Sequence, residues 1–314
     1  MENLAELNPD EIKDEWDKFK VKYRTGSELN IMKDYKEPTR RAIFADNYRA
    51  IHKHNIEAND GKHTYWLGVN KFTDMSIDEF RHVYLCKSPT LEQELASRRL
   101  SGWSKFNIYH RNVPNSVNWR HRGAVTRVKN QGELSVQHVI DGLNMPSALE
   151  SGGYCDEVYE FVMRQGGLMS ESNYPFRNDF DPTQLKSHKK IVTIEDYELS
   201  RDHNEMTLRQ IVACIGPVAV GIRINGQKFR DYSRGVCDNC DGPPPYDYHA
   251  VVVVGYGTET FNGIDHDYWL IKNSYSEDWG ESGYMKLARK GTNLCYIASN
   301  CAFPTGVRKV LVII

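Results

Sequence analysis

The sequence lacks an excess of charge of one sign and lacks long apolar runs, and each absence excludes a class of function. Its 40 lysines and arginines nearly balance 42 aspartates and glutamates, giving a formal net charge of -2 without blocks of like charge. A nucleic-acid partner is therefore not expected, because polyanion binding needs concentrated basic residues. No apolar run approaches the roughly 18 residues that a spanning helix requires, so we expect no membrane span.

The chain also lacks targeting and glycosylation signals. Its first residues, MENLAELNPDEIKDEW, are acidic and contain no apolar core typical of a secretory signal peptide. No Asn-x-Ser/Thr acceptor occurs. With 314 residues and 40% apolar content, the composition predicts a globular protein with one domain of moderate size and a smaller one.

Residues 14 to 112 are predicted to form helices followed by an extended polar segment. Trp16, Phe19 and Tyr23 recur at helical spacing. A second helical face carries both apolar and polar residues: Glu37, Arg41, Phe44, Asn47, Ile51 and Asn55. Polar side chains on a packed face must find partners, which favours a specified polar network over a simple apolar stripe. Pro38 is compatible with this helix only in its first turn, so residues 25–36 before it are expected to form a loop.

This pattern resembles the E-x3-R-x2-F-x2-N-x3-I-x3-N helix in the inhibitory propeptide of papain-like, cathepsin L-like cysteine proteases. The Gly68-x-Asn70-x-Phe72-x-Asp74 segment, which we expect to be a strand, is similar to a second propeptide motif. The resemblance implies that residues 1–112 are an inhibitory propeptide, which in this family runs backwards through the active-site cleft. The cathepsin-like order of the two motifs makes a chance match improbable.

Residues 113–314 resemble a papain-like peptidase domain. Its first segment, VPNSVNWRHRGAVTRVKNQG, is similar to the start of the mature enzyme, and Gln131 falls where the family places its oxyanion-hole glutamine. The implied fold is α+β, with a helical left domain and an antiparallel β-barrel right domain. A lone Gln-Gly pair would otherwise predict only a turn.

Two later segments carry the rest of the family's catalytic pattern. DYHAVVVVGYG (residues 247–257) is predicted to be a buried strand with His249 near its start, and DYWLIKNSYSEDWGESGY (residues 267–284) a strand ending at Asn273. The resemblance implies that His249 is the general base and that Asn273 orients its imidazole. Tyr275 departs from the family, which usually has a tryptophan shielding this bond.

The nucleophile of the resembled family is missing. Its cysteine lies six residues after the glutamine, a position occupied here by Gln137, whose amide nitrogen cannot act as a thiolate. LSVQHVIDG (residues 134–142) instead resembles the family's LSEQxLVDC segment, which follows the central helix, so that helix is interpreted as deleted after Gln131. His249 is only 112 residues beyond position 137, about 20 short of the usual spacing.

Cysteines that would pair with the deleted region are absent too. The resemblance implies half-cystines at positions that carry Glu150 and Gly142, and another shortly after Tyr174-Pro175, yet none of these positions is a cysteine. Coordinated loss favours a genuine deletion over a splicing or gene-model error, which remains the alternative. Ser135 and Cys155 are the nearest substitutes for the nucleophile, and no motif places either beside His249.

The seven cysteines leave at least one thiol unpaired within the chain. They are Cys86, Cys155, Cys214, Cys237, Cys240, Cys295 and Cys301. Cys237-x2-Cys240 together with the two last cysteines could suggest zinc. The family resemblance instead implies a late disulfide from Cys295 to Cys237 or Cys240, and no cofactor or metal.

Three functional hypotheses follow. The first is a catalytically inactive papain-family protein, in which Gln131, His249 and Asn273 are remnants. The second is an active cysteine endopeptidase that cuts peptide or protein substrates, of which this chain is a defective form. The third is an inhibitor that binds a related cysteine protease through residues 1–112. The resemblance implies a lysosomal or extracellular protein, although no secretory signal is visible.

Overall fold

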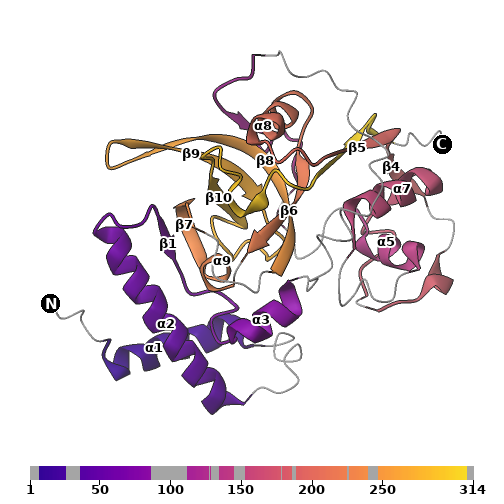
Figure 1. Ribbon diagram of the computed structural model, residues 1–314. Helices are drawn as coiled ribbons and strands as arrows, with labels where there is room; N and C mark the ends of the chain where they lie inside the picture. The colour runs from indigo at the N-terminus through magenta and orange to yellow at the C-terminus, as the bar shows by residue number, and fades with distance from the viewer. Residues whose placement is uncertain are drawn as a thin grey trace.

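The computed structural model describes ten stretches of the chain. These are residues 7–25, 36–85, 112–126, 128, 134–144, 153–177, 179–185, 189–224, 226–239 and 247–309. We call residues 7–85 the N-terminal unit and residues 112–309 the body (Figure 1). Within the described part of the chain, no helix has the length and apolarity needed to cross a membrane.

Two helices open the N-terminal unit, as predicted. α1 (Pro9–Tyr23) begins at Asn8, whose side chain accepts a hydrogen bond from the Asp10 N–H at 3.0 Å. α2 (Glu37–Asn59) starts with Pro38 in its first turn, where the missing N–H is not needed. The helices cross and bury a small cluster of their own (Figure 1), formed by Trp16, Phe19, Tyr23 and Phe44.

The segment from Gly68 to Asp74 was expected to be a strand, and this expectation is wrong. The strand β1 (Tyr65–Leu67) ends just before it, and the motif itself forms turns. The Asn70 side chain accepts the Phe72 N–H at 2.9 Å, so it satisfies the backbone locally and bends the chain. α3 (Ile77–Tyr84) follows, with a capping box between Ser76 and Glu79.

A nine-stranded sheet forms the right half of the body and extends into the N-terminal unit. Its main order is β1-β7-β10-β9-β8-β6-β11-β5, with β2 paired to β8. The strands are β2 (Val117–Asn118), β5 (Asp196–Ser200), β6 (Val218–Ile224), β7 (Tyr232–Cys237), β8 (Asp247–Phe261), β9 (Ile264–Lys272), β10 (Tyr284–Ala288) and β11 (Cys301–Thr305). Neighbours pair antiparallel, as expected, except that β7 and β10 run parallel. α8 (Glu205–Cys214), α9 (Gln227–Arg230) and η3 (Leu294–Tyr296) accompany this sheet.

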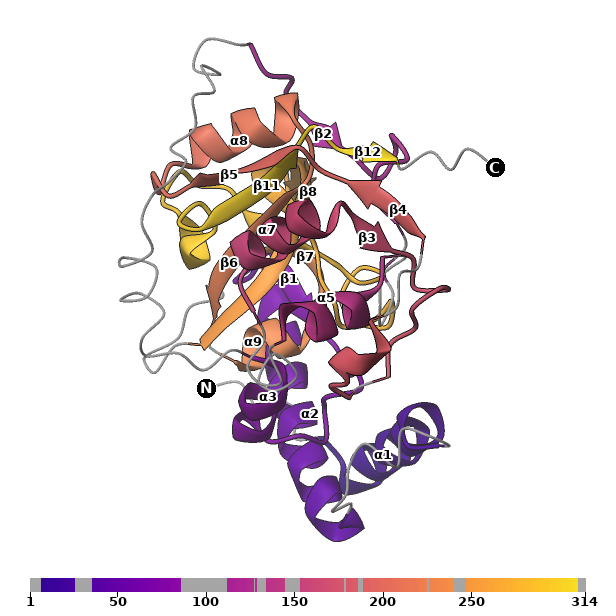
Figure 2. The same ribbon diagram turned by 90° about the vertical axis from the view of Figure 1, so that its right-hand side faces the viewer.

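The left half of the body is smaller and has a core separate from the main one. It contains α5 (Val136–Leu143), α7 (Cys155–Gln165), η2 (Pro182–Gln184) and a short sheet of β3 (Leu168–Met169), β4 (Lys190–Thr193) and β12 (Arg308–Lys309). Figure 2 shows α5 and α7 next to one another in front of the large sheet. Phe161, Val162 and Leu168 are the fully buried members of this core.

Gly142 shows how closely α5 and α7 approach one another. A Cβ added there would lie 2.2 Å from the Phe161 ring, so only glycine fits in the present packing. This is one of the positions at which the resemblance implied a half-cystine. The ring of Phe161 therefore fills the space into which such a side chain would point.

Candidate active-site remnant

The structure brings His249 and Asn273 together. His249 lies on β8 opposite Ile222 of β6, and Asn273 directly follows β9, which pairs with the other edge of β8. Nε2 of His249 lies 2.8 Å from Oδ1 of Asn273. Because this oxygen also accepts the Ser274 N–H, the imidazole proton is assigned to Nε2, and Nδ1 is left unprotonated.

Tyr275 covers the imidazole of His249. The two rings stack with centroids 4.8 Å apart and an interplanar angle of 28°. The tyrosine hydroxyl lies 3.5 Å from Nδ1, the nitrogen that Asn273 leaves unoccupied. Burial lowers the pKa of His249 to about 4, and the hydrogen bond that it donates to Asn273 offsets only part of this effect. The side chain is therefore neutral near pH 7.

Aromatic residues of the N-terminal unit close over Tyr275. The rings of Phe72, Phe80 and Tyr84 lie 5.2, 5.8 and 5.7 Å from its ring, each in an edge-on arrangement. The Tyr275 hydroxyl is also 3.4 Å from the Tyr84 carbonyl oxygen. Phe80 and Tyr84 were not expected at this site from the sequence, although their spacing of four residues on one helix is a usable signal.

Gln137 is a structural residue of α5 in this protein. It is completely buried, and its amide nitrogen donates to Asp141 Oδ1 at 3.0 Å and to the Asp179 carbonyl at 2.7 Å. Its amide oxygen accepts the Arg177 N–H at 2.9 Å. Asp141 continues the network through the Tyr174 hydroxyl, at 2.7 Å. All polar atoms of the Gln137 side chain are thus committed to the left half.

The two substitute nucleophiles are not activated. The Ser135 hydroxyl caps α5 by accepting the His138 N–H at 2.9 Å, and it donates to the Tyr174 carbonyl at 2.5 Å. Cys155 begins α7, and burial, with a smaller effect of Asp156, raises its pKa to about 11. A reactive cysteine needs a lowered pKa instead.

Three further features that the sequence suggested are the oxyanion-hole glutamine, the late disulfide and a metal site. Gln131 lies outside the described residues, so its role as an oxyanion donor stays a prediction. Cys237 has a buried free thiol whose pKa is raised to about 12 by burial, so of the two expected partners of Cys295 it is not the one. The other, Cys240, lies outside the described residues. In the described stretches, no group of three histidine, cysteine or acidic residues could hold a metal ion.

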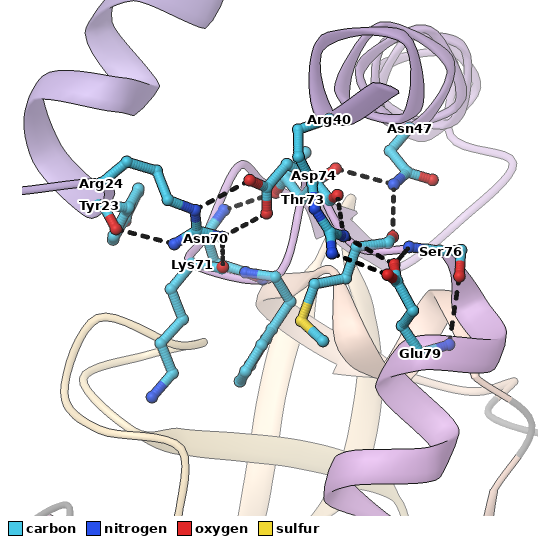
Figure 3. A network of polar contacts seen from close by, with 12 residues as sticks. Tyr23, Arg24, Arg40, Asn47, Asn70, Lys71, Thr73, Asp74, Ser76 and Glu79 are labelled. Atoms are coloured by element: carbon cyan, nitrogen blue, oxygen red, sulfur yellow. Dashed lines mark hydrogen bonds and ion pairs between the residues drawn. The ribbon is translucent and has the colours of Figure 1, made fainter. Parts of the chain in front are cut away.

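The polar network predicted on α2 exists, but one of its residues was assigned wrongly. Asn47 donates to the carbonyl oxygens of Thr73 and Met75, at 2.8 and 3.1 Å (Figure 3). Arg40, and not the exposed Arg41, is the buried arginine, and its guanidinium binds Glu79 at 2.7 and 2.8 Å. Steps of three and four residues both fit a helical face, which is why spacing alone selected the wrong neighbour.

Further bonds hold the same loop to both helices. Asn55 bonds both backbone polar groups of Leu67 at 2.9 Å, and Arg24 forms an ion pair with the buried Asp74 (Figure 3 shows the latter). Glu37 instead lies at the surface, 2.7 Å from Lys20. The network therefore shapes the turns that connect β1 to α3.

Comparison with known proteins identifies the family. Residues 132–305 match the family described as papain family cysteine protease. The chain belongs to this family. Residues 16–80 of the papain-family chain match the cathepsin propeptide inhibitor domain (I29), which accounts for most of the N-terminal unit.

Relatives of this papain-family chain include cathepsins from animals. Cathepsin L of Sarcophaga peregrina is 33% identical over 324 aligned residues, which cover 94% of each protein. Cathepsin S of Mus musculus is 32% identical and covers 87% of this chain and 86% of its own.

Solved proforms share the fold. Digestive procathepsin L 3 of Tenebrio molitor larval midgut has a TM-score of 0.75 at 29% identity, covering 94% of this chain and 99% of its own. The proform of the ragweed pollen cysteine protease Amb a 11 has a TM-score of 0.76 at 28% identity and covers 95% of each chain. The predicted papain-like fold with a helical prodomain is confirmed.

Proposed function

We propose that this papain-family protein is not a peptidase and that its catalytic residues persist in a structural role. The observation that carries this proposal is the bonding of Gln137, whose amide satisfies Asp141, Asp179 and Arg177. These bonds are those of an ordinary helical residue. They support aligning residues 134–142 with the segment beyond the family's central helix, which leaves the nucleophile and that helix absent.

The surroundings of His249 support the same proposal. A general base works best with a pKa near the operating pH, and burial holds this imidazole well below that, at about 4. Nδ1, the nitrogen that would take a proton from a nucleophile, faces the Tyr275 hydroxyl at 3.5 Å. In the family's catalytic pattern a cysteine thiol would lie beside this nitrogen.

Peptide hydrolysis by the purified full-length chain tests this proposal. A fluorogenic peptide library and a protein substrate should show no turnover above a heat-treated sample, at neutral pH or at pH 5. Preincubation with a thiol alkylator should change nothing. Turnover that the alkylator abolishes would contradict the proposal and would favour the alternative of an active endopeptidase acting on protein substrates.

A second candidate function is inhibition of a related cysteine protease. It is favoured by the intact polar network of the N-terminal unit, whose Arg40–Glu79 and Arg24–Asp74 pairs hold the inhibitor-like loop in shape. Titration of the full-length chain, and then of residues 1–112, against an active cathepsin L-like protease would measure this. Nanomolar inhibition is the expected result for this candidate, and its absence at micromolar concentration would reject it.

We also propose a domain boundary at residues 112/113, between the N-terminal unit and the body.

A disulfide between Cys295 and Cys240 is a further proposal. Among the described cysteines, Cys155, Cys214, Cys237 and Cys301 are free, and Cys295 is not. Of the remaining cysteines, Cys240 belongs to the region that the family resemblance pairs with Cys295. Peptide mapping without reduction should recover the two joined, and a Cys295–Cys86 peptide would contradict the pairing.

A further inference from the structure

The body buries an ion pair between two sequence neighbours at the end of α9. Arg230 and Asp231 both have side chains with no exposed surface. Their contact is bidentate, with Nε to Oδ1 and Nη2 to Oδ2 both at 2.8 Å. Removing both charges from water is costly, and the cost is offset only where the remaining polar atoms also find partners.

The N-terminal unit supplies those partners. The third guanidinium nitrogen, Nη1 of Arg230, donates to the Met75 carbonyl at 2.8 Å. Asn70 Nδ2 donates to the Arg230 carbonyl at 2.7 Å, and the Gly68 N–H donates to the Asp231 carbonyl at 2.8 Å. Three hydrogen bonds thus join the turns after β1 to this one dipeptide.

Strand pairing continues the same contact. β1 adds to the edge of the large sheet through β7, with Tyr65 opposite Gly235. Gly235 has φ +85°, and a Cβ there would lie 2.4 Å from the Thr64 carbonyl oxygen, so the close approach requires glycine. Val236 donates to that oxygen at 2.9 Å. The N-terminal unit therefore adds a strand to the large sheet and also covers the Arg230–Asp231 pair.

The apolar core is also shared between the two parts. One cluster includes Tyr65, Leu67 and Phe72 of the N-terminal unit together with Tyr232 and Trp279 of the body. Trp279 in turn donates from Nε1 to the Arg230 carbonyl at 3.0 Å. Separation of the N-terminal unit from the body would expose this apolar surface and the buried Arg230–Asp231 pair to water.

We infer that the N-terminal unit is a permanent structural part of this protein, seated on the body by the buried Arg230–Asp231 pair, and is not removed to produce a functional form. The inference rests on the proposed function, because a chain without a nucleophile cannot cut its own connection at residues 86–111. It goes further, because it requires the unit to stay bound after that connection is cut.

Cutting the connection tests the inference directly. A recognition site for a site-specific protease is inserted after Leu100 of the full-length chain, and the cut sample is diluted to about 10 nM at pH 7.5 before size-exclusion chromatography. We expect the two fragments to elute together. Separate elution of folded fragments would overturn the inference. The uncut and cut samples are assayed for peptide hydrolysis, so that turnover would refute the proposed function independently.

Variants of the Arg230–Asp231 pair test whether it keeps the cut N-terminal unit bound to the body. Arg230→Leu leaves Asp231 buried without its partner and should weaken retention of the cut unit by about a hundredfold or more. In the double variant Arg230→Leu/Asp231→Leu, which is apolar at both positions, retention should recover to within about tenfold of the original. Equal retention in all three proteins would show that the pair does not seat the unit.

A matched control uses an exposed ion pair at the same interface. Lys22 of α1 lies 3.5 Å from Asp278 of the body, and both side chains are 58% exposed. Lys22→Ala should leave retention unchanged, because exposed pairs contribute little.

If Arg230→Leu does not fold, Asn70→Ala is the alternative variant. It removes the hydrogen bond that the N-terminal unit donates to the Arg230 carbonyl, and it should also weaken retention. Unchanged retention in Asn70→Ala would then count against the inference.

Discussion

At the scale of single residues, Gln137 shows how a side chain at the position expected for a nucleophile is used to hold the left half together. Its backbone belongs to the first turn of α5, and its side chain joins that turn to the backbone of residues 177 and 179. Each of these bonds is buried, so losing one costs the desolvation of the atom left behind. We therefore expect substitutions of Gln137 to lower the free energy of unfolding.

Gln137→Cys should therefore not create a peptidase. We expect no hydrolysis of peptides by this variant, and a loss of about 1 to 3 kcal/mol in the free energy of unfolding from the unsatisfied groups around it. Urea unfolding of the variant beside Val136→Ala, a change at a half-exposed position of the same helix, would measure the difference. Hydrolysis by Gln137→Cys would show that the interpretation as a deletion is wrong.

His138 should make the left half sensitive to acid. Burial and, to a lesser extent, Lys190 lower its pKa to about 4, against a weaker opposite effect of Asp141. The unfolded chain, with a histidine pKa near 6.5, binds more protons below that pH, so stability falls as pH falls from about 6.5 towards 4. Between pH 7 and pH 5 we expect a loss of about 1 to 2 kcal/mol.

His138→Asn tests the acid sensitivity, because its side chain does not titrate and can still accept the Met169 N–H that His138 Nδ1 accepts at 3.4 Å. Urea unfolding at pH 7 and pH 5 should give a smaller difference for the variant than for the original chain. An undiminished difference would assign the acid effect to other groups.

At the scale of elements, the contact of α5 with α7 shows what spacing can and cannot predict. The motifs located His249 and Asn273 because fixed segments precede each one, and pairing of β8 with β9 then brings them together. They could not predict that the Phe161 ring occupies the space beside Gly142, because that depends on how α5 and α7 pack together. Likewise, Arg40 and Arg41 fit one helical pattern equally well, and only the position of Glu79 distinguishes them.

Gly142→Ala should destabilise the left half. Alanine normally favours a helix over glycine by up to about 1 kcal/mol, but here the added methyl would meet Phe161 and cost about 1 to 3 kcal/mol. Hydrogen exchange of α5 and α7 should accelerate, with β8 unchanged. The control is Gly216→Ala, where an added methyl meets no atom within 4 Å. Stabilisation by Gly142→Ala would contradict the packing described here.

At the scale of the whole molecule, the N-terminal unit is divided between two cores. Its inner residues belong to the large cluster of the body, whereas α1 and the facing side of α2 form a separate aromatic cluster with four buried members among the described residues. A small cluster contributes less free energy than a large one. The helix α1 should therefore open without disturbing the strand β1, whereas α2 is bonded to β1 through Asn55.

Native-state hydrogen exchange would show this order. We expect amides of α1 to exchange through an opening of lower free energy than those of β1 and β7. Phe19→Ala should lower the opening free energy of the α1 amides by about 3 to 5 kcal/mol, or to zero if α1 is less stable than that. The opening free energy of the β1 amides should not change. Equal loss of protection in both would indicate one cooperative unit.

The contact between His249 and Asn273 has a consequence for recognising enzymes by geometry. The two side chains keep a 2.8 Å bond, and the rings of Tyr275 and Phe229 pack against the imidazole whether or not any reaction takes place. A search template made of the imidazole and the amide alone would retrieve this chain whether or not it is a peptidase. A template that also requires a thiol beside Nδ1 would retrieve it only if the proposed function is wrong.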